Sequence, residues 1–288
     1  MQYDDDALPK EEQNTFTRRA VLEALGTGVI ASGVVGCTGR ANATTSHDEE
    51  LTPELYHSST RALAYSIRTG EVSSVEVVQA FLDRIEAVNA KLNAVVVLAG
   101  DEALDAAREA DAQLSRGELT GPLHGVPMTI KDSIDTAGVV TTYGTKGRSK
   151  FVPEKDATVV SRLKSAGAIL MGKTNTPEFT LSYETRNDVY GVTNNPYDLA
   201  RTPGGSSGGA SAILAAGGSP FDIGSDYGGS IRLPSHCAGT AGIKPTSGRV
   251  PRTGHGFPFG GMLDALQQLG PMARYVTDLS LLLSLIHI

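Results

Sequence analysis

Two short segments rich in glycine and serine constrain this chain more than any other feature. They read GGSSGGAS at 204–211 and SDYGGSIR at 225–232, and a mostly apolar stretch separates them. Glycine loses more backbone freedom on folding than any other residue, so two such dense clusters need a physical reason. Either the clusters are flexible filler, or the backbone comes close to another group there and points serine hydroxyls at it.

The rest of the chain alternates between helix-like and strand-like patterns. Apolar residues recur at helical spacing in several segments, and short apolar runs lie between them. The expected helices are 73–93, 101–117, 157–168 and 209–218; the expected strands are 94–99, which should be buried, 125–134, 169–174 and 221–226. This alternation predicts an α/β fold with a mixed, largely parallel sheet covered by helices on both faces.

Polar residues follow several of the expected strands. Lys131 and Asp226 are placed near strand ends, and Ser230 comes four residues after Asp226. Ser206 precedes an expected helix, where backbone N–H groups can face a negative charge. Because ligands of such sheets bind beyond the carboxyl ends of the strands, these residues are candidates for one site.

Composition excludes some classes of function. The 288 residues carry a net charge of −7 with a pI near 5.4, whereas a nucleic-acid binder needs a basic face. Two cysteines, Cys37 and Cys237, provide no disulfide framework. The six histidines are scattered without the spacing of metal ligands. We therefore expect no metal and no nucleic-acid partner.

The N-terminal segment differs in character from the rest. Residues 15–37, TFTRRAVLEALGTGVIASGVVGC, place paired arginines before a small, apolar stretch that is short and glycine-rich for a membrane span. This pattern is typical of twin-arginine export signals. VVGC also resembles a lipoprotein box, in which Cys37 is lipidated. We predict an export signal at 1–36, a polar tether at 37–50 and an extracytoplasmic, membrane-anchored protein, with an amphipathic or buried first helix as the alternative.

Two common readings of glycine-rich loops fit poorly. A phosphate-binding loop needs G-x-x-x-x-G-K-[ST], and Lys244, in GIKPT, is followed by a proline that stops the required helix. GGSSG at 204–208 matches the G-x-S-x-G of α/β-hydrolases, but that serine must follow a buried strand. The preceding segment, 194–203, is polar and contains prolines, and neither His236 nor His255 stands in a convincing relation to it.

A third reading accounts for both clusters. The stretch 203–250 closely resembles the signature region of the amidase signature family, whose members hydrolyse carbon–nitrogen bonds. The resemblance extends to 121–145, 167–179 and 266–283, in the same order as in the family. It covers nearly all of 51–283, which we therefore expect to be an amidase signature domain.

The resemblance implies a Ser–cis-Ser–Lys triad. Lys131 takes the position of the catalytic lysine, Ser206 that of the bridging cis-serine and Ser230 that of the nucleophile. It also implies hydrolysis of a small-molecule amide through an acyl-enzyme intermediate, without metal or organic cofactor. A lysine serves as the base only if it is deprotonated near neutral pH, and burial lowers a lysine pKa in that direction.

The same resemblance assigns further residues around the substrate. The backbone amides of Tyr227, Gly228, Gly229 and Ser230 would line an oxyanion hole, and Thr180 lies in a loop that contacts substrate in relatives. Tyr227 departs from the family pattern, which more often has threonine or isoleucine there. That change leaves the amide in place but alters the acyl pocket.

Each residue also has a structural interpretation. Lys131 beside Asp132 would, on its own, read as a surface ion pair. Asp226 and Arg232 are expected to hold the site by hydrogen bonds and to take no part in the chemistry. Cys237 is expected to be a small buried side chain.

Three questions stay open at this point. The A subunit of a glutamine-dependent tRNA amidotransferase is the alternative function, which the export signal disfavours because charged tRNA is cytoplasmic. Family chains usually continue well past the equivalent of residue 283, so we expect a C-terminally incomplete sheet and a tail of uncertain status at 284–288. A truncated, inactive amidase-like fragment is therefore a further alternative, and a homodimer is also left open.

Overall fold

The computed structural model describes residues 50–256 and 265–288. The predicted export signal at 1–36, Cys37, and all of the predicted tether at 37–50 except its last residue lie outside the described residues. Within the described ranges, no helix combines the length and the apolar character needed to span a bilayer.

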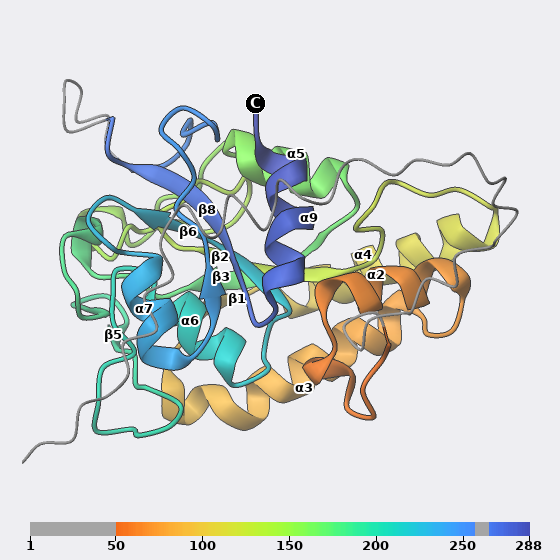
Figure 1. Cartoon of the computed structure of the whole chain (residues 1–288), viewed down its shortest axis with the longest axis horizontal. Helices are drawn as coiled ribbons and strands as arrows, with labels where there is room; N and C mark the ends of the chain where they lie inside the picture. The colour runs from red at the N-terminus through yellow and green to blue at the C-terminus, as the bar shows by residue number, and fades with distance from the viewer. Residues whose placement is uncertain (1–49, 257–264) are drawn as a thin grey trace, which may run out of the picture. The chain divides into compact units, whose positions relative to one another are not determined.

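A six-stranded sheet forms the centre of the described chain (Figure 1). The strand order is β1-β3-β2-β6-β8-β7. β2 is parallel to both β3 and β6, while β1, β8 and β7 each pair antiparallel to their neighbours. The bounds are β1 Val95–Leu98, β2 Pro127–Lys131, β3 Ile169–Thr174, β6 Phe221–Asp226, β7 Ala241–Gly242 and β8 Gln268–Ala273, with a separate hairpin of β4 Arg186–Asn187 and β5 Gly191–Val192.

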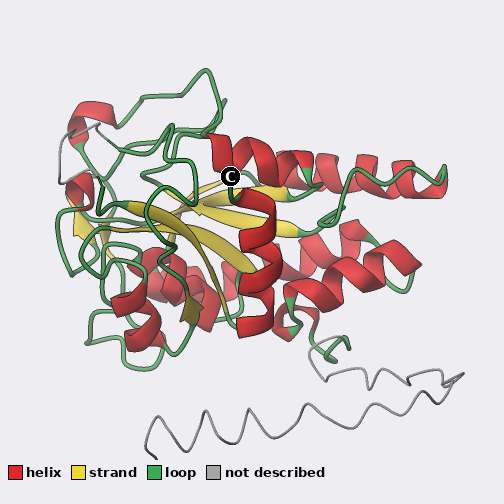
Figure 2. Ribbon diagram, turned by 45° about the horizontal axis from the view of Figure 1, so that its top comes forward, coloured by secondary structure: helices red, strands yellow, loops and turns green. Residues whose placement is uncertain are grey.

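Helices lie on both sides of this sheet (Figure 2). A small apolar cluster joins α6 and the start of α7 to strand β8, and the larger core fills the rest. The helices are α2 Thr60–Thr69, α3 Ser74–Leu92, α4 Gly100–Ser115, α5 Thr158–Ser165, α6 Gly208–Ala215, α7 Arg232–Ala238 and α9 Val276–Ile286, with short 3₁₀ turns η2 Leu55–His57, η3 Lys146–Arg148 and η4 Glu178–Thr180. The predicted mixed α/β sheet, parallel at its centre, is confirmed.

Helix α3 illustrates how local sequence sets an element. Ser73 accepts a hydrogen bond from the amide of Glu76, and the Glu76 carboxylate accepts one from the amide of Ser73. This capping box satisfies two amides that the first turn leaves without helical partners. At the other end Asn93 adopts a left-handed conformation with φ 49°, which ends the helix. The helix predicted over 73–93 is therefore confirmed.

One feature differs from expectation, and two others were not predicted. The segment predicted as a buried strand, 94–99, forms the sheet edge β1, where Leu98 is 56% exposed. Strand β8 contains Pro271, which lacks the N–H of a regular ladder but still accepts a hydrogen bond from the Ile243 amide. The tail at 284–288 is also built into the fold, because α9 continues to the fully buried Ile286.

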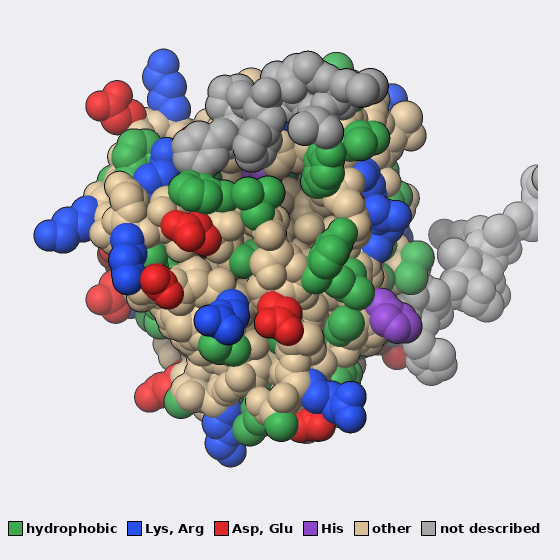
Figure 3. Space-filling model, turned by 90° about the vertical axis from the view of Figure 1, so that its left-hand side faces the viewer, with side chains coloured by type: hydrophobic (Ala, Val, Ile, Leu, Met, Phe, Trp, Pro, Cys, Tyr) green, Lys and Arg blue, Asp and Glu red, His purple; other side chains and the backbone are tan. Residues whose placement is uncertain are grey.

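Some large hydrophobic side chains remain exposed. They include Leu181, Tyr197 and Val276, which come from segments far apart in the sequence. On the face shown in Figure 3, hydrophobic side chains form several small groups among polar ones. Scattered exposed hydrophobic residues are normal for folded proteins and do not by themselves mark a partner site.

Asp278 on α9 joins the end of the described chain to its beginning. Its two carboxylate oxygens accept hydrogen bonds from the amides of Thr60 (2.9 Å) and Arg61 (3.1 Å) in the first turn of α2. Ser59 accepts from the next amide, that of Ala62, at 3.0 Å. Three of the four amides that a helix start leaves without intrahelical partners are thereby satisfied.

Replacing Asp278 by alanine should destabilise the protein by about 1–3 kcal/mol, because two amides at a buried helix start lose their acceptor. The loss is measured by denaturant unfolding. Asp101→Ala, in the exposed first turn of α4, is the control and should cost less than about 0.5 kcal/mol. Equal losses in the two variants would contradict the role of Asp278.

Candidate active site

Lys131 is the last residue of β2 and is completely buried. Its Nζ donates hydrogen bonds to the hydroxyls of Ser206 (2.6 Å), Ser207 (2.9 Å) and Ser225 (2.9 Å). Within the described residues, no carboxylate lies within 4 Å of this amine. The amine is thus solvated by three hydroxyls without a paired negative charge.

This environment changes the acidity of the lysine. Burial lowers the pKa of Lys131 from 10.5 to about 7, while the negative charges of Asp222 and Asp226 oppose that shift. Near neutral pH a large share of the molecules therefore carries a neutral amine, which has a lone pair to accept a proton. The alternative of a surface ion pair with Asp132 is excluded, because both side chains are fully buried and the Asp132 carboxylate accepts hydrogen bonds from Thr142.

The first glycine–serine cluster carries Ser206 to this amine. The peptide bond between Gly205 and Ser206 is cis, as the family resemblance implied. A Cβ on Gly205 would lie 2.9 Å from the backbone oxygen of Ser182, so a side chain has no room at that position. Close packing of backbone against backbone is therefore the reason for this glycine.

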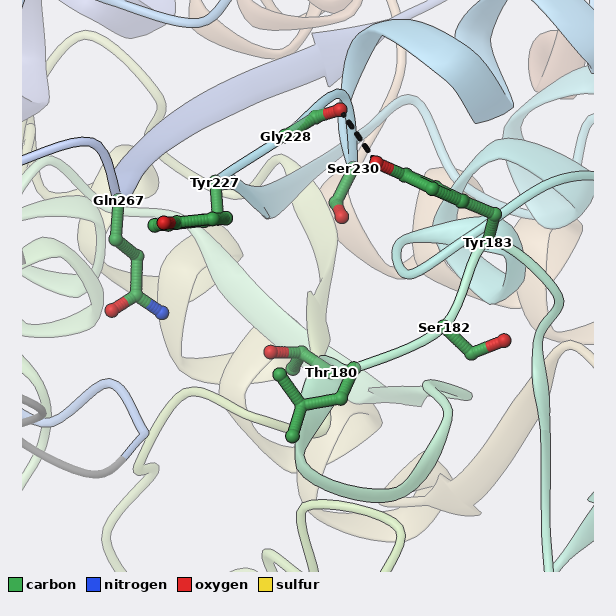
Figure 4. A pocket seen from close by; sticks show the side chains of 8 residues that line it. Thr180, Ser182, Tyr183, Tyr227, Gly228, Ser230 and Gln267 are labelled. Atoms are coloured by element: carbon green, nitrogen blue, oxygen red, sulfur yellow. Dashed lines mark hydrogen bonds between the residues drawn. The ribbon is translucent and has the colours of Figure 1, made fainter. Parts of the chain in front are cut away.

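The second cluster carries Ser230 next to the first. The amide of Ser207 donates to the carbonyl oxygen of Ser230 at 3.1 Å. Ser230 is 7% exposed, and its hydroxyl points into a pocket between Tyr227 and Tyr183 (Figure 4). Among the described side chains, however, no hydrogen bond joins the hydroxyls of Ser206 and Ser230. The structure brings Lys131 and Ser206 into contact and places Ser230 beside them without closing that second contact.

Asp226 shapes the loop that holds Ser230. Its fully buried carboxylate accepts from the amides of Gly229 (2.8 Å) and Ile231 (3.1 Å) and from two nitrogens of Arg232 (both 3.0 Å). Burial alone would raise the pKa of this carboxyl, but these hydrogen bonds outweigh it and hold the pKa well below its usual range. Asp226 and Arg232 thus make the structural contacts expected of them.

The same contacts correct one predicted assignment. The N–H of Gly229, a residue with φ +125°, donates to Asp226 and therefore already has an acceptor. Gly229 is not a member of the oxyanion hole in this geometry. The amides of Tyr227, Gly228 and Ser230 have no acceptor within 50–256 and 265–288, so these three remain as donors.

Neighbouring side chains hold the carbonyl groups of this loop. The Tyr183 hydroxyl donates to the carbonyl oxygen of Gly228 at 3.2 Å (Figure 4). Lys244 donates to the carbonyl oxygen of Tyr227 at 2.6 Å. With both carbonyls bonded to side chains, the loop is held in a conformation in which the amides of Tyr227 and Gly228 have no acceptor among the described residues.

The pocket in front of Ser230 has a volume of about 330 Å³. None of its lining residues is charged: they are Thr180, Leu181, Ser182, Tyr183, Tyr227, Gly228, Ser230 and Gln267. Thr180, predicted to contact substrate, lines the pocket from the end of η4 and has φ 62°. The two tyrosines give the pocket aromatic walls that suit an uncharged ligand.

Sequence patterns did not identify several residues near the site. Ser207 and Ser225 belong to the glycine–serine clusters, whose composition indicated a site, but only the fold shows that both hydroxyls reach Lys131.

His255 is buried, and that burial lowers its pKa to about 3, so its imidazole is neutral. It lies between Ser133 (3.1 Å) and the pocket residue Gln267 (2.9 Å).

Two further observations concern the histidine, cysteine and acidic side chains of the described residues. Within the described residues, no group of three histidine, cysteine or acidic side chains is arranged to hold a metal ion. Cys237, expected to be buried, is only partly so; its sulfur lies near Gly204.

Comparison with known proteins places this site in a family. The model of the family described as Amidase matches residues 76–287. The chain belongs to the amidase family. Its relatives include the A subunit of the glutamyl-tRNA(Gln) amidotransferase of Carboxydothermus hydrogenoformans, 47% identical over 81% of this chain, and that of Moorella thermoacetica, 46% identical over the same share. The chain spans about half the length of these relatives (47% of each).

Solved amidase structures have the same fold. A fatty acid amide hydrolase superposes with a TM-score of 0.77 and 35% identity, covering 81% of this chain and 42% of its own. The peptide amidase of Stenotrophomonas maltophilia gives a TM-score of 0.75 and 36% identity, covering 81% of this chain and 48% of its own. The predicted family and fold are therefore confirmed.

Lys131→Met should change how stability depends on pH. Because folding lowers the lysine pKa from 10.5 to about 7, the wild type loses stability as the pH falls from 10.5 towards 7. A methionine binds no proton, so its unfolding free energy does not fall in this way. As the pH falls from 10.5 towards 7, the unfolding free energy of the variant should therefore rise relative to that of the wild type, by about 1 kcal/mol per pH unit. Denaturant unfolding at several pH values measures the gap.

Lys146→Met is the matched control for this experiment. Its side chain is exposed, so the pH dependence of unfolding should stay that of the wild type. A gap between Lys131→Met and wild type that stays constant between neutral and alkaline pH would show that Lys131 is not held as a neutral amine.

Proposed function

We propose that this chain provides the nucleophile, relay and base of an amidase that hydrolyses small-molecule amides. The observation that carries the proposal is the fully buried Lys131 amine, hydrogen-bonded to three serine hydroxyls and, among the described residues, to no carboxylate. A serine hydroxyl is a weak nucleophile and needs a base within hydrogen-bond reach, directly or through another group. A lysine with a pKa near 7 has the proton affinity for that task.

The reaction would proceed in two steps, acylation of Ser230 and hydrolysis of the acyl-enzyme. Ser230 Oγ attacks the amide carbonyl, and its proton passes through the Ser206 hydroxyl to Lys131 Nζ. The amides of Tyr227, Gly228 and Ser230 stabilise the oxyanion, which then collapses and breaks the C–N bond as the leaving amine takes that proton. A water molecule, activated by the same base, hydrolyses the acyl ester and restores the Ser230 hydroxyl. Ser206 must turn toward Ser230 for this relay, and catalytic hydrogen bonds often tighten only with substrate bound.

Replacing Ser230, Ser206 or Lys131 by alanine in the full-length protein should lower amide hydrolysis by roughly 10³-fold or more, because the three groups act as one unit. A fluorophosphonate should label wild-type protein at Ser230, as shown by mass spectrometry. Ser211→Ala is the control, since this buried α6 hydroxyl donates to the Pro234 carbonyl outside the triad, and the variant should keep both label and activity. A Lys131→Ala enzyme of near-normal rate would remove Lys131 as the base.

A second function is supported by specific relatives. Proteins 47% and 46% identical to this chain are A subunits of glutamyl-tRNA(Gln) amidotransferases. Ammonia release from glutamine that depends on partner subunits would favour that role, whereas hydrolysis of uncharged amides by the protein alone favours the amidase. A folded wild-type protein that takes no fluorophosphonate would instead support the inactive fragment.

We also propose that the protein is exported and lipidated. The support is the sequence alone: paired arginines before a short apolar stretch that ends at Cys37. Cys37→Ser should release the protein from the membrane fraction of cells, because the thioether to the lipid cannot form. An unchanged membrane fraction would overturn the lipid anchor, and wild-type protein confined to the cytoplasm would overturn the export signal.

A further inference from the structure

Asp222 is a buried carboxylate close to the site that the mechanism above does not use. It lies on the central strand β6 and is fully buried. One oxygen accepts hydrogen bonds from the hydroxyls of Thr129 (2.7 Å) and Thr174 (3.0 Å). The other oxygen is buried and has no hydrogen-bond partner among the described residues. A carboxylate so poorly satisfied is costly to bury, which sets Asp222 apart from Asp226.

The sheet register places Asp222 near Lys131 without contact. Asp222 pairs with Thr129 on the neighbouring strand β2, and Lys131 is two residues further along β2. Side chains two residues apart in a strand point to the same face, at a spacing of about 7 Å. No ion pair within 4 Å joins the two groups in the described structure. The carboxylate therefore attracts the amine through a dry interior but does not hold it in a salt bridge.

We propose that Asp222 is a positioning residue for Lys131, whose negative charge sets how readily this buried amine takes up a proton. The inference rests on the proposed role of Lys131 as the base. A direct salt bridge would keep the lysine protonated and unable to act as a base. An amine with no negative charge nearby would be too weak a base to draw a proton from a serine. Asp222 lies between these two limits, because its carboxylate is on the same face of the sheet as Lys131, two residues away in the register, and is not bonded to the amine.

The charges around both groups are consistent with this role. Lys131 faces Asp222 and Asp226 from β6, and the buried His255 beside it is neutral. On β3, Lys173 also acts on Asp222 and helps keep it ionised. Burial raises the pKa of Asp222 to about 6, so the carboxylate is mostly charged at the pH where Lys131 loses its proton. Of the negative charges that act on Lys131, that of Asp222 is the strongest.

The test compares pH profiles of Asp222→Asn and wild type in the full chain. The asparagine oxygen can still accept from Thr129 and Thr174, so the packing is kept while the charge is removed. The rate of fluorophosphonate labelling at Ser230 should rise with pH in both proteins. In Asp222→Asn the midpoint of that rise should move to lower pH by about 1 unit, because the amine loses a negative charge that stabilises its protonated form.

Two further variants sharpen the comparison. Asp222→Ser removes the same charge with a smaller hydroxyl side chain and should shift the midpoint in the same direction. It replaces Asp222→Asn in the test if the asparagine variant does not fold. Asp132→Asn removes an equally buried carboxylate next to Lys131 in the chain, one that bonds to Thr142, and should leave the midpoint unchanged. A merely structural role for Asp222 would alter the melting temperature but not the midpoint.

The outcomes separate this inference from the proposed function. Labelling with the wild-type midpoint in both Asp222 variants would overturn the inference and leave the triad intact. If wild-type Ser230 takes no label, the proposed function fails. The inference is then decided by the titration of the Lys131 side chain followed by NMR, where the same shift supports it and no shift overturns it.

Discussion

The structure depends on one unusual burial, that of the Lys131 amine at the end of a central strand. Burying a lysine amine costs free energy because the amine loses its hydrogen bonds to water. Three serine hydroxyls replace those hydrogen bonds. Because hydroxyls carry no charge, they solvate the amine without forcing it to stay protonated. The lowered pKa of Lys131 is thus a direct consequence of which groups surround it.

The glycine–serine clusters supply this surrounding. Ser206 and Ser207 come from the first cluster, Ser225 and Ser230 from the second, and each cluster must approach the other and β2 closely. Glycines permit that approach where a Cβ would collide, as at Gly205. The sheet then brings the clusters together, because β2 and β6 are parallel neighbours and their carboxyl ends meet at one edge.

Sequence patterns were sufficient for the elements with strong local signals. The helical spacing of apolar residues in α3 and the apolar runs of β2, β3 and β6 were readable, and the motifs placed Lys131, Ser206 and Ser230 in one neighbourhood. Features that depend on tertiary pairing were not readable. Strand β8 contains Gly270 and Pro271 and is recognisable as a strand only beside β6. That Gly229 donates to Asp226, and that Asp222 lies near Lys131, follow from loop geometry and register, which no local pattern encodes.

A titration of the Lys131 side chain tests the central claim most directly. Its ε-carbon resonance, assigned by its loss in Lys131→Met, can be followed by NMR from acid to alkaline pH. A buried amine among hydroxyls predicts a midpoint close to 7. A midpoint near the ordinary value of 10.5 would show a solvated or ion-paired lysine, and Lys131 could then not serve as the base.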